Sequence, residues 1–533
     1  MGVFISVPKT IECVITAVVF SVLLSACFYK PLGILQSCGY SGGKLMNWAA
    51  KKGNKIFSRH ILLAMLCALA CAVISLCFSF AGEYAAVVGL SAYVIFFILY
   101  FVADKKIALR SPASFTSRFK RLYVISFLLC AIFVYLAVTL LNFADFIWGY
   151  GVFGVLRYCA LAVFPLLIFP VILLANLVAK IYEVPHNAKF VKKAAARIAN
   201  SEIKIIGITG SYGKTSTKLI LNSILSEKYR VLSTPRSHNT PMGVALTING
   251  AELEGYDFFI AEMGARHVGD IAELCELFPP DYSAITGICS QHLESFGSEE
   301  NIVRAKAEIL AYTKKSAVIS PDCFGLFSSY GCEKIAADCV SDIEATCDGT
   351  EFTLTLGGES LRVKTKLLGR HSAENIGLAA AIAFAVGMTL KEIAGAVDKI
   401  DFIEHRLQLI KSGGVNILDD GYNSNVKGAA AALEVLKSFG GSKIVVTPGL
   451  VELGILEESE NKRLGERLAG LDYVILVGET LIQPVKEGYL AAGGDADRLI
   501  IKPTLNEAQE QLKSILKNGD TVLFLNDLPD IYM

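Results

Sequence analysis

The distribution of hydrophobic and polar residues divides the chain into an apolar N-terminal third and a longer remainder of alternating pattern. The N-terminal part contains five apolar stretches, each close to the ~20 residues that a helix needs to cross a bilayer. They cover residues 11–28, 61–80, 85–103, 122–141 and 158–179. We expect five transmembrane helices. A buried helical domain is the alternative, and a cleaved signal peptide fits less well because further stretches follow the first.

The segments between these stretches differ in charge, and the difference predicts an orientation. Segments 29–60 and 104–121 are rich in Lys and Arg, whereas segments 81–84 and 142–157 together contain only one such residue. Because Lys and Arg are enriched in cytoplasmic loops, we expect a multi-pass protein of the cell membrane with its N-terminus outside and its remaining domains in the cytoplasm. The basic segment 186–200 fits an amphipathic connector near the membrane, or else a plain linker.

The pattern changes after residue 200, where short β-rich runs alternate with segments of helical periodicity. This alternation indicates parallel sheets with helices on both faces. Residues 350–366 fit a hairpin around Gly357 and Gly358. The strand-like runs cover 203–209, 257–263, 282–288 and 316–320, and the helix-like runs cover 216–228, 299–313 and 373–387.

A second set of alternating runs begins near residue 403, and we place a domain boundary near 388–402. The predicted organisation is a transmembrane helical region at 1–185, an α/β domain at 186–401 and a second α/β domain at 402–533. The strand-like runs of the second set cover 415–420, 443–449, 473–478 and 520–526, and its helix-like runs cover 428–438, 457–469 and 505–517.

Charge and cysteine content exclude some functions. The net charge is zero over 533 residues, so the chain lacks the basic surface expected of a nucleic-acid-binding protein. Its 14 cysteines include no C-x-x-C pair, and we expect them to be reduced thiols. The series Cys323, Cys332, Cys339 and Cys347 lacks the spacing of a zinc ribbon.

The strongest candidate for chemistry is the segment 205–216, which reads I-I-G-I-T-G-S-Y-G-K-T-S. A strand, a glycine-rich loop and a helix in this order form a phosphate site, with backbone N–H groups, a Lys and a hydroxyl around the anion. The spacing departs from the usual P-loop, because five residues separate Gly207 from Gly213. A chance glycine-rich turn is the alternative. The candidate nucleotide-binding residues are Gly210, Ser211, Gly213, Lys214, Thr215 and Ser216.

Further motifs follow in a fixed order. They are N-T-P-M-G at 239–243, A-E-M-G-A at 261–265, Q-H-L-E-S-F-G-S at 291–298, A-K-A-E-I at 305–309, G-R-H-S-A-E-N at 369–375, E-H-R at 404–406 and D-D-G-Y-N-S-N at 419–425. Together with the glycine-rich loop they resemble the Mur ligases, the ATP-dependent amide-forming enzymes of peptidoglycan precursor synthesis. The resemblance covers about residues 200–533. The D-x-Y-N-x-N and E-L-G elements are most similar to the member that adds D-alanyl-D-alanine.

The resemblance implies a P-loop-type central domain, a Rossmann-like C-terminal domain and a reaction. A carboxylate is activated by ATP as an acyl phosphate, and an amine then attacks it, so positioned cations dominate catalysis. Lys214, His292 and Lys306 would be the catalytic residues. Asn375 would contact the adenine, and Arg406 and Asp420 would reach the phosphate and ribose as the domains close over ATP.

The resemblance also implies two Mg²⁺ ions and a modified lysine. Thr215 would hold the first Mg²⁺, and Glu262, His292 and a carbamylated Lys306 would surround the second. Asn239 and His267 match positions near the phosphate and the acyl substrate. From the residues alone, each of these has an ordinary alternative as a solvated loop residue, a buried His or a surface Lys.

The sequence also departs from the family. Five apolar stretches stand where the family has a soluble UDP-sugar-binding domain, and Val426 replaces the proline that usually follows N-x-N. We expect a membrane-anchored ligase that adds D-alanyl-D-alanine to a UDP-muramoyl tripeptide. A ligase for a lipid-linked or other envelope acid, with an amino acid or dipeptide as its amine substrate, is one alternative. A transporter or scaffold with a relic nucleotide-binding module is another, although the intact Lys214, Glu262 and Lys306 argue against a relic. The sequence identifies no protein partner.

Overall fold

The structure is a computed structural model that describes residues 7–50, 66, 113–148, 167–235, 238–421, 425–478 and 481–526. Contacts within the chain divide it into two units, one reaching His186 and the other beginning at Asn187. We describe each unit by itself.

The first unit is helical in its described part. Two helices are long and apolar enough to cross a membrane, Ser117–Leu141 and Ile168–Ala199. The expected stretch at 11–28 forms only a shorter apolar helix, and the stretches at 61–80 and 85–103 lie almost entirely outside the described residues. The described residues therefore show two candidate membrane-spanning helices, and not the five that we expected. The helices are α1 (Val7–Ser25), η1 (Ala26–Phe28), α2 (Tyr29–Ser37), α3 (Gly42–Ala50), α6 (Ser117–Trp148) and α8 (Ile168–Ala199).

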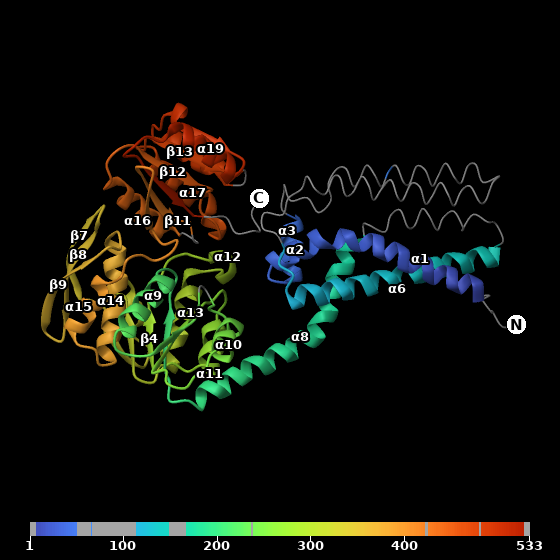
Figure 1. The fold of residues 1–533 in the computed structure, drawn as a ribbon, viewed down its shortest axis with the longest axis horizontal. Helices are drawn as coiled ribbons and strands as arrows, with labels where there is room; N and C mark the ends of the chain where they lie inside the picture. Colours follow the sequence, from blue (N-terminus) through green and yellow to red (C-terminus); the bar gives the residue numbers. More distant parts are fainter. Residues whose placement is uncertain are drawn as a thin grey trace. The chain divides into compact units, whose positions relative to one another are not determined.

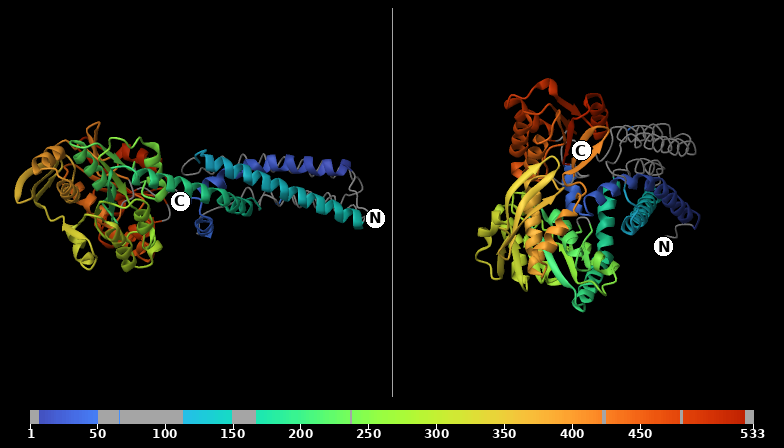
Figure 2. Two further views of the ribbon diagram at one scale, coloured as in Figure 1. Left: turned by 90° about the horizontal axis from the view of Figure 1, so that it is seen from below. Right: turned by 60° about the vertical axis from the view of Figure 1, so that its left-hand side comes forward.

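Helices α1 and α6 pack side by side and contribute to the core of this unit together with the shorter helices and α8 (Figures 1 and 2). Leu24, Leu122 and Val134 are fully buried between the helices. The opposite faces expose large apolar side chains, including Ile15 on α1 and Leu140 on α6. Each helix thus has one apolar face against its neighbours and a second apolar face without a protein partner among the described residues.

Helix α8 continues through Pro185 to Ala199, where we expected a separate connector. Its last two turns belong to the second unit, because Val191, Ala194 and Ile198 are buried in the core of that unit. Arg197 Nη1 also donates a hydrogen bond of 2.7 Å to the carbonyl oxygen of Ile248. The apolar side of the predicted connector at 186–200 is therefore covered by protein of the second unit.

The second unit begins with a six-stranded parallel sheet in the order β2-β3-β1-β4-β5-β6. We call the part around this sheet the central domain. Successive side chains of a strand point to opposite faces of the sheet. Ile205 therefore packs in the core cluster on one face, and Ile206 in the core cluster on the other. The strands are β1 (Lys204–Thr209), β2 (Val231–Ser233), β3 (Phe258–Glu262), β4 (Tyr282–Ile285), β5 (Ser316–Ile319) and β6 (Glu333–Ala336).

Helices cover both faces of this sheet, as the alternation predicted. One cluster joins the sheet to α9 (Lys214–Ser226), α14 (Arg370–Ala385) and α15 (Leu390–Asp398). The other joins it to the end of α8, α10 (Pro241–Gly250), α11 (Asp270–Leu277), α12 (Leu293–Phe296) and α13 (Glu299–Tyr312). A 3₁₀ helix, η3 (Pro321–Phe327), follows β5.

A separate antiparallel sheet of three strands packs against α14 and α15. It contains β7 (Val340–Thr346), β8 (Gly349–Leu356) and β9 (Glu359–Thr365). The turn between β8 and β9 falls at Gly357 and Gly358, both with positive φ angles, so the predicted hairpin is confirmed. We did not predict β7, whose side chains are mostly exposed and polar.

A second six-stranded sheet has the order β10-β11-β15-β12-β13-β14, and we call the part around it the C-terminal domain. Only the β10–β11 pair is antiparallel. The strands are β10 (Gln408–Ser412), β11 (Val415–Asp420), β12 (Lys443–Thr447), β13 (Tyr473–Val477), β14 (Leu499–Lys502) and β15 (Thr521–Leu525). The helices are α16 (Val426–Lys437), η4 (Gly454–Leu456), α17 (Glu457–Leu468), α18 (Ile482–Ala491), η5 (Ala496–Arg498) and α19 (Leu505–Ile515).

Helices α17 and α18 approach each other backbone to backbone. A Cβ atom at Gly465 would lie 2.0 Å from the carbonyl oxygen of Val485. A Cβ atom at Gly488 would lie 1.9 Å from the carbonyl oxygen of Lys462. No side chain fits at either position without separating the helices, because such contacts are far below van der Waals distance.

Candidate active site

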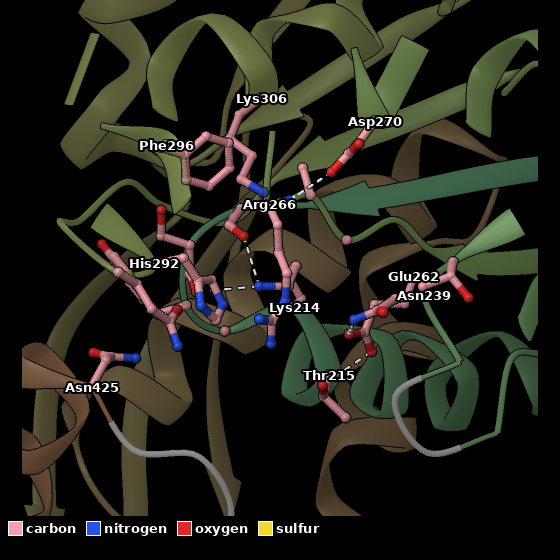
Figure 3. Close-up of a pocket in the computed structure, with 18 of the residues that line it drawn as sticks. Lys214, Thr215, Asn239, Glu262, Arg266, Asp270, His292, Phe296, Lys306 and Asn425 are labelled. Atoms are coloured by element: carbon pink, nitrogen blue, oxygen red, sulfur yellow. Dashed lines mark hydrogen bonds between the residues drawn. The ribbon is translucent and has the colours of Figure 1, made fainter. Parts of the chain in front are cut away.

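A cavity of about 440 Å³ opens at the carboxyl ends of β1 and β3, where ligands bind in open α/β sheets (Figure 3). Twelve of the predicted site residues line it, namely Gly210, Ser211, Gly213, Lys214, Thr215, Ser216, Asn239, Glu262, His267, His292, Lys306 and Arg406. Asn375 and Asp420 do not line it. Residues that we did not predict also contribute, namely Tyr212, Thr240, Gly264, Ala265, Arg266, Asp270, Gln291, Phe296 and Asn425.

The loop between β1 and α9 has the geometry of a phosphate cradle. Gly210 and Gly213 have φ angles of 146° and 77°, which favour glycine. A Cβ atom at Gly210 would lie 2.2 Å from Thr286 Oγ1, so no side chain fits at this position. Lys214, the first residue of α9, donates hydrogen bonds of 2.7 and 3.2 Å to the carbonyl oxygens of Gly210 and Ser211. Its ammonium thus sits over the loop at a helix N-terminus, where an anion is favoured.

Burial lowers the pKa of Lys214, and the negative charge of Glu262 opposes that shift. Bringing a phosphate next to the ammonium would favour the protonated form further. The lysine is therefore arranged to pair with an anionic ligand.

Glu262 ends β3 and is almost fully buried, with three polar partners. Thr215 Oγ1 donates a hydrogen bond of 3.0 Å to Oε2, and Asn239 Nδ2 donates one of 3.1 Å to Oε1. Lys218 Nζ lies 3.2 Å from Oε2 in a fully buried ion pair. Burial lowers the pKa of Lys218, and Glu262 opposes that shift.

Lys218 was missed by the sequence analysis. It lies one helical turn after Lys214, in K-T-S-T-K, on the same side of α9. That i, i+4 spacing was the available signal. Because Lys218 compensates the charge of Glu262, it keeps a buried carboxylate beside the phosphate loop.

Lys306 is buried on α13, and its Nζ lies 5.7 Å from the centre of the Phe296 ring. Burial, reinforced by the neighbouring Lys214 cation, lowers the pKa of Lys306 to about 7. Among the described residues no carboxylate forms an ion pair with it. A large fraction of this amine is therefore unprotonated at neutral pH, unlike an ordinary surface lysine.

His292 lines the cavity, and its imidazole contacts the C-terminal domain. Nδ1 lies 2.6 Å from Oε2 of Glu452, whose other oxygen accepts a hydrogen bond of 3.2 Å from Arg266. Burial works to raise the pKa of Glu452, but the contacts with His292 and Arg266 hold it at about 2. Glu452 is thus a carboxylate at neutral pH. We quoted its E-L-G motif but assigned it no role.

His267 lies on the loop between β3 and α11, and its side chain is exposed. The backbone N–H groups of Arg266 and His267 donate hydrogen bonds of 2.8 and 2.9 Å to Asp270 Oδ2. This carboxylate shapes the loop and places His267 at the wall of the cavity.

The predicted nucleotide residues outside the lining lie next to it. Asn375 on α14 accepts a hydrogen bond of 3.2 Å from Thr217 Oγ1, behind the phosphate loop. Asp420 ends β11 and accepts a hydrogen bond of 3.3 Å from the Leu407 N–H. Burial raises the pKa of Asp420 to about 7, against the attraction of Arg406. Asn425 lines the cavity and caps α16, accepting a hydrogen bond of 3.0 Å from the Gly428 N–H.

The donors around the phosphate loop suit a hard cation. Thr215 and Glu262 present oxygen atoms next to the anion cradle, and Mg²⁺ prefers oxygen ligands supplied partly by substrate phosphates and water. In the part of the chain that the structure describes, no three His, Cys, Asp or Glu side chains lie together as a metal cage. The residues therefore fit Mg²⁺ bound together with a nucleotide rather than a preformed metal centre.

Comparisons with known proteins identify relatives of both α/β domains. A family model described as the Mur ligase middle domain matches residues 208–383, and one described as the Mur ligase glutamate ligase domain matches residues 405–526. The UDP-N-acetylmuramoyl-tripeptide–D-alanyl-D-alanine ligase of Escherichia coli (strain K12) is 32% identical over 334 residues, which cover 59% of this chain and 74% of that protein.

The ligase of the same name from Bacillus subtilis (strain 168) is 30% identical over 345 residues, covering 62% of this chain and 74% of its own length. Among solved structures, MurF ligase from Thermotoga maritima in complex with ADP is similar, with a TM-score of 0.58 and 27% identity. The match covers 65% of this chain and 81% of that one.

Proposed function

The chain belongs to the Mur ligase family of ATP-dependent amide ligases, and on this premise we propose that it joins D-alanyl-D-alanine to a UDP-N-acetylmuramoyl-tripeptide in peptidoglycan synthesis. The observation that carries the proposal is the cavity itself. It combines a glycine-rich anion cradle, a carboxylate beside it and a buried lysine of low pKa. The relatives that are named for this reaction match 59% and 62% of this chain.

The proposed reaction forms an acyl phosphate from the tripeptide carboxylate and ATP, which the amine of D-alanyl-D-alanine then attacks. Negative charge builds on the transferring phosphoryl group and on the tetrahedral intermediate, so fixed positive charge accelerates both steps. Lys214 supplies that charge at the loop. Mg²⁺ bound with the nucleotide would supply more, held through Thr215 and Glu262.

Lys306 is proposed to carry a carbamate. The reaction is R–NH₂ + CO₂ → R–NH–COO⁻ + H⁺, so it needs the unprotonated amine. The lowered pKa of Lys306 supports this, because ordinary lysines are almost fully protonated at pH 7. The product would place a carboxylate in the same cavity as Glu262 and His292, where a second Mg²⁺ could bind.

We also propose that the N-terminal unit anchors the enzyme in the cell membrane, with the catalytic domains in the cytoplasm. Two helices of sufficient length and hydropathy support the proposal. Their exposed apolar side chains, such as Leu128, Leu136 and Leu177, would be satisfied by lipid. Arg118, Lys120 and Arg121 cluster at the start of α6, as expected at a cytoplasmic boundary.

The exposed apolar helices also favour a second candidate, a ligase whose acid substrate is linked to lipid. A soluble substrate can reach the catalytic domains without a membrane-bound unit, whereas a lipid-linked substrate stays in the membrane and must be bound there. The proposed anchor explains the helices equally well, and the relatives named above carry the name of a UDP-linked substrate.

The test is release of ADP by the purified full chain in detergent or bilayers. UDP-N-acetylmuramoyl-tripeptide with D-alanyl-D-alanine should give ADP, phosphate and a UDP-linked pentapeptide. Omitting the dipeptide should abolish the product, and the Lys214→Ala variant provides a matched inactive control. Turnover with a lipid-linked tripeptide, combined with none on the UDP-linked one, would overturn the assignment in favour of the second candidate.

A further inference from the structure

A loop of the C-terminal domain contacts His292 from outside the cavity. Glu452, Leu453 and Gly454 follow β12 and lead into α17. The Glu452 carboxylate makes two contacts with the central domain, one to His292 Nδ1 at 2.6 Å and one to Arg266 Nη2 at 3.2 Å. Both contacts join residues more than 150 positions apart in the sequence. Glu452 itself does not line the cavity.

The backbone around this contact is unusual on both sides. His292 has a φ angle of 57° and Glu452 one of 62°, in the left-handed region that side-chain-bearing residues rarely adopt. Such conformations are energetically unfavourable and persist where the surrounding structure enforces them. Two of them meet at a single ion pair. Strain at functional sites is a common reason for this pattern.

Packing holds the loop against the helix that follows His292. A Cβ atom at Gly454 would lie 3.0 Å from the backbone nitrogen of Glu294 in α12. Leu456, at the end of η4, packs against the cores of both the central and the C-terminal domain. The position of Glu452 is therefore fixed by the docking of the two domains and not by its own side chain alone.

The chemistry of the pair determines where the imidazole carries its proton. A carboxylate accepts hydrogen bonds and has no proton to give. With Glu452 Oε2 only 2.6 Å away, a proton on Nδ1 is favoured over a lone pair there, and in the neutral ring the lone pair then lies on Nε2. A histidine that binds a metal is ordinarily held in this way, by a second residue on its other ring nitrogen.

We propose that Glu452 is a positioning residue, which holds His292 in the Nδ1–H tautomer and leaves Nε2 available to the cavity. The C-terminal domain thereby contributes to the part of the cavity that contains His292, as well as to the part that binds the nucleotide. His292 is oriented only while the two domains are docked. This inference deepens the proposed function, and its kinetic consequence rests on that function.

The first experiment observes the proton directly. The chain contains seven histidines, so ¹⁵N spectra of the full chain labelled only at histidine show few imidazole signals. The signal missing from the His292→Gln spectrum identifies His292. We expect it to show a protonated Nδ1 and an unprotonated Nε2 in the wild type. In Glu452→Ala, which leaves Nδ1 without an acceptor, the single Nδ1–H state should be lost, and in Glu452→Gln, whose amide can present either an acceptor or a donor, it should become mixed.

The second experiment measures turnover. Removing the partner of a histidine at a metal or catalytic position costs roughly 10- to 100-fold in activity or metal affinity. We expect Glu452→Gln to lower kcat by that amount with little change in KM for ATP, and to raise the Mg²⁺ concentration needed for half-maximal rate. Glu458→Gln is the matched control. It removes one exposed acid from the first turn of α17, six residues further on.

The outcomes separate this inference from the proposed function. A wild-type His292 with its proton on Nε2, or an unchanged tautomer in both Glu452 variants, would overturn the inference whatever the substrate is. A normal kcat in Glu452→Gln with a changed tautomer would also overturn it, because the orientation would then have no role. If the chain ligated no UDP-linked acid, the tautomer would still be measured, and only the proposed function would fail.

Discussion

The central and C-terminal domains are built alike but contribute to the cavity in different ways. Each has a six-stranded, mainly parallel sheet with helices on both faces. In the central domain the strands β1 and β3 end directly in site residues, a bare backbone loop and Glu262. Of the described residues of the C-terminal domain, Arg406 and Asn425 alone line the cavity. The two domains thus share an architecture but contribute differently to the site, because their contributions depend on the residues at the strand ends and not on the fold.

The comparison predicts a hierarchy of effects. In the proposed function, residues of the central domain act on the phosphate and the acyl group themselves, so their loss should remove turnover. Residues of the C-terminal domain act through docking, orientation and nucleotide contact, so their loss should reduce turnover without abolishing it.

The largest effect is expected for Lys214→Ala. The phosphate loop would lose the cation whose hydrogen bonds bridge the carbonyl oxygens of Gly210 and Ser211. We expect kcat for ADP release to fall by about 10³-fold or more, with an unchanged unfolding midpoint. Retention of near-normal turnover would show that the loop does not hold the phosphates.

Lys306→Arg tests whether this residue acts as a cation or as a carbamate. Arginine keeps the positive charge but cannot become an oxygen ligand. We therefore expect Lys306→Arg to be as inactive as Lys306→Ala, on the order of 10²-fold or more below the wild type. Mass spectrometry of the native protein should show a CO₂ adduct that acidification removes. An active Arg variant would show that the charge alone matters.

Arg406→Ala tests the C-terminal contribution. Arg406 lines the cavity although it lies far from the phosphate loop in sequence. A lost charge-assisted hydrogen bond to a phosphate is worth about 1.5–3 kcal/mol, so we expect kcat/KM for ATP to fall roughly 10- to 100-fold. A loss as complete as that of Lys214→Ala would break the proposed hierarchy.

The smallest effect concerns stability and its dependence on pH. Burial raises the pKa of Asp420 to about 7, so the folded protein keeps a proton that the unfolded chain releases near pH 4. The folded state binds more protons between these two values, and stability therefore declines as the pH rises from about 4 to 7. Asp420→Asn, which cannot ionise, should flatten that decline in denaturant titrations. A decline of equal slope in the variant would assign it to other groups.

Much of the architecture followed from the sequence because the strands are buried on both faces. The run at 203–209 corresponds to β1 (Lys204–Thr209), and the run at 299–313 corresponds to α13. The predictions failed where the local pattern is weak. β7 exposes most of its side chains, and β2 has only three residues. The predicted linker at 186–200 lacked any signal that its apolar side would meet the central domain.

Twelve of the predicted site residues share one cavity because motifs at the ends of neighbouring parallel strands must meet. Sequence periodicity does not show which residues from distant parts of the chain contact a given site residue in the folded protein. Lys218 has the sequence pattern of an exposed helical lysine, and only the approach of β3 brings Glu262 to it. Glu452 reaches His292 from the other domain, and nothing local to either residue indicates that contact.

The close contact between α17 and α18 restricts which substitutions the sequence can accept at two glycine positions. Gly465 and Gly488 do not line the cavity, yet a single extra methyl group at either would lie about 2 Å from a backbone oxygen. Displaced helices would carry with them the loop that precedes α17. A genetic selection for impaired ligation would therefore recover alanine substitutions at these two glycines. Their carriers would resemble catalytic mutants in phenotype while retaining every residue of the site.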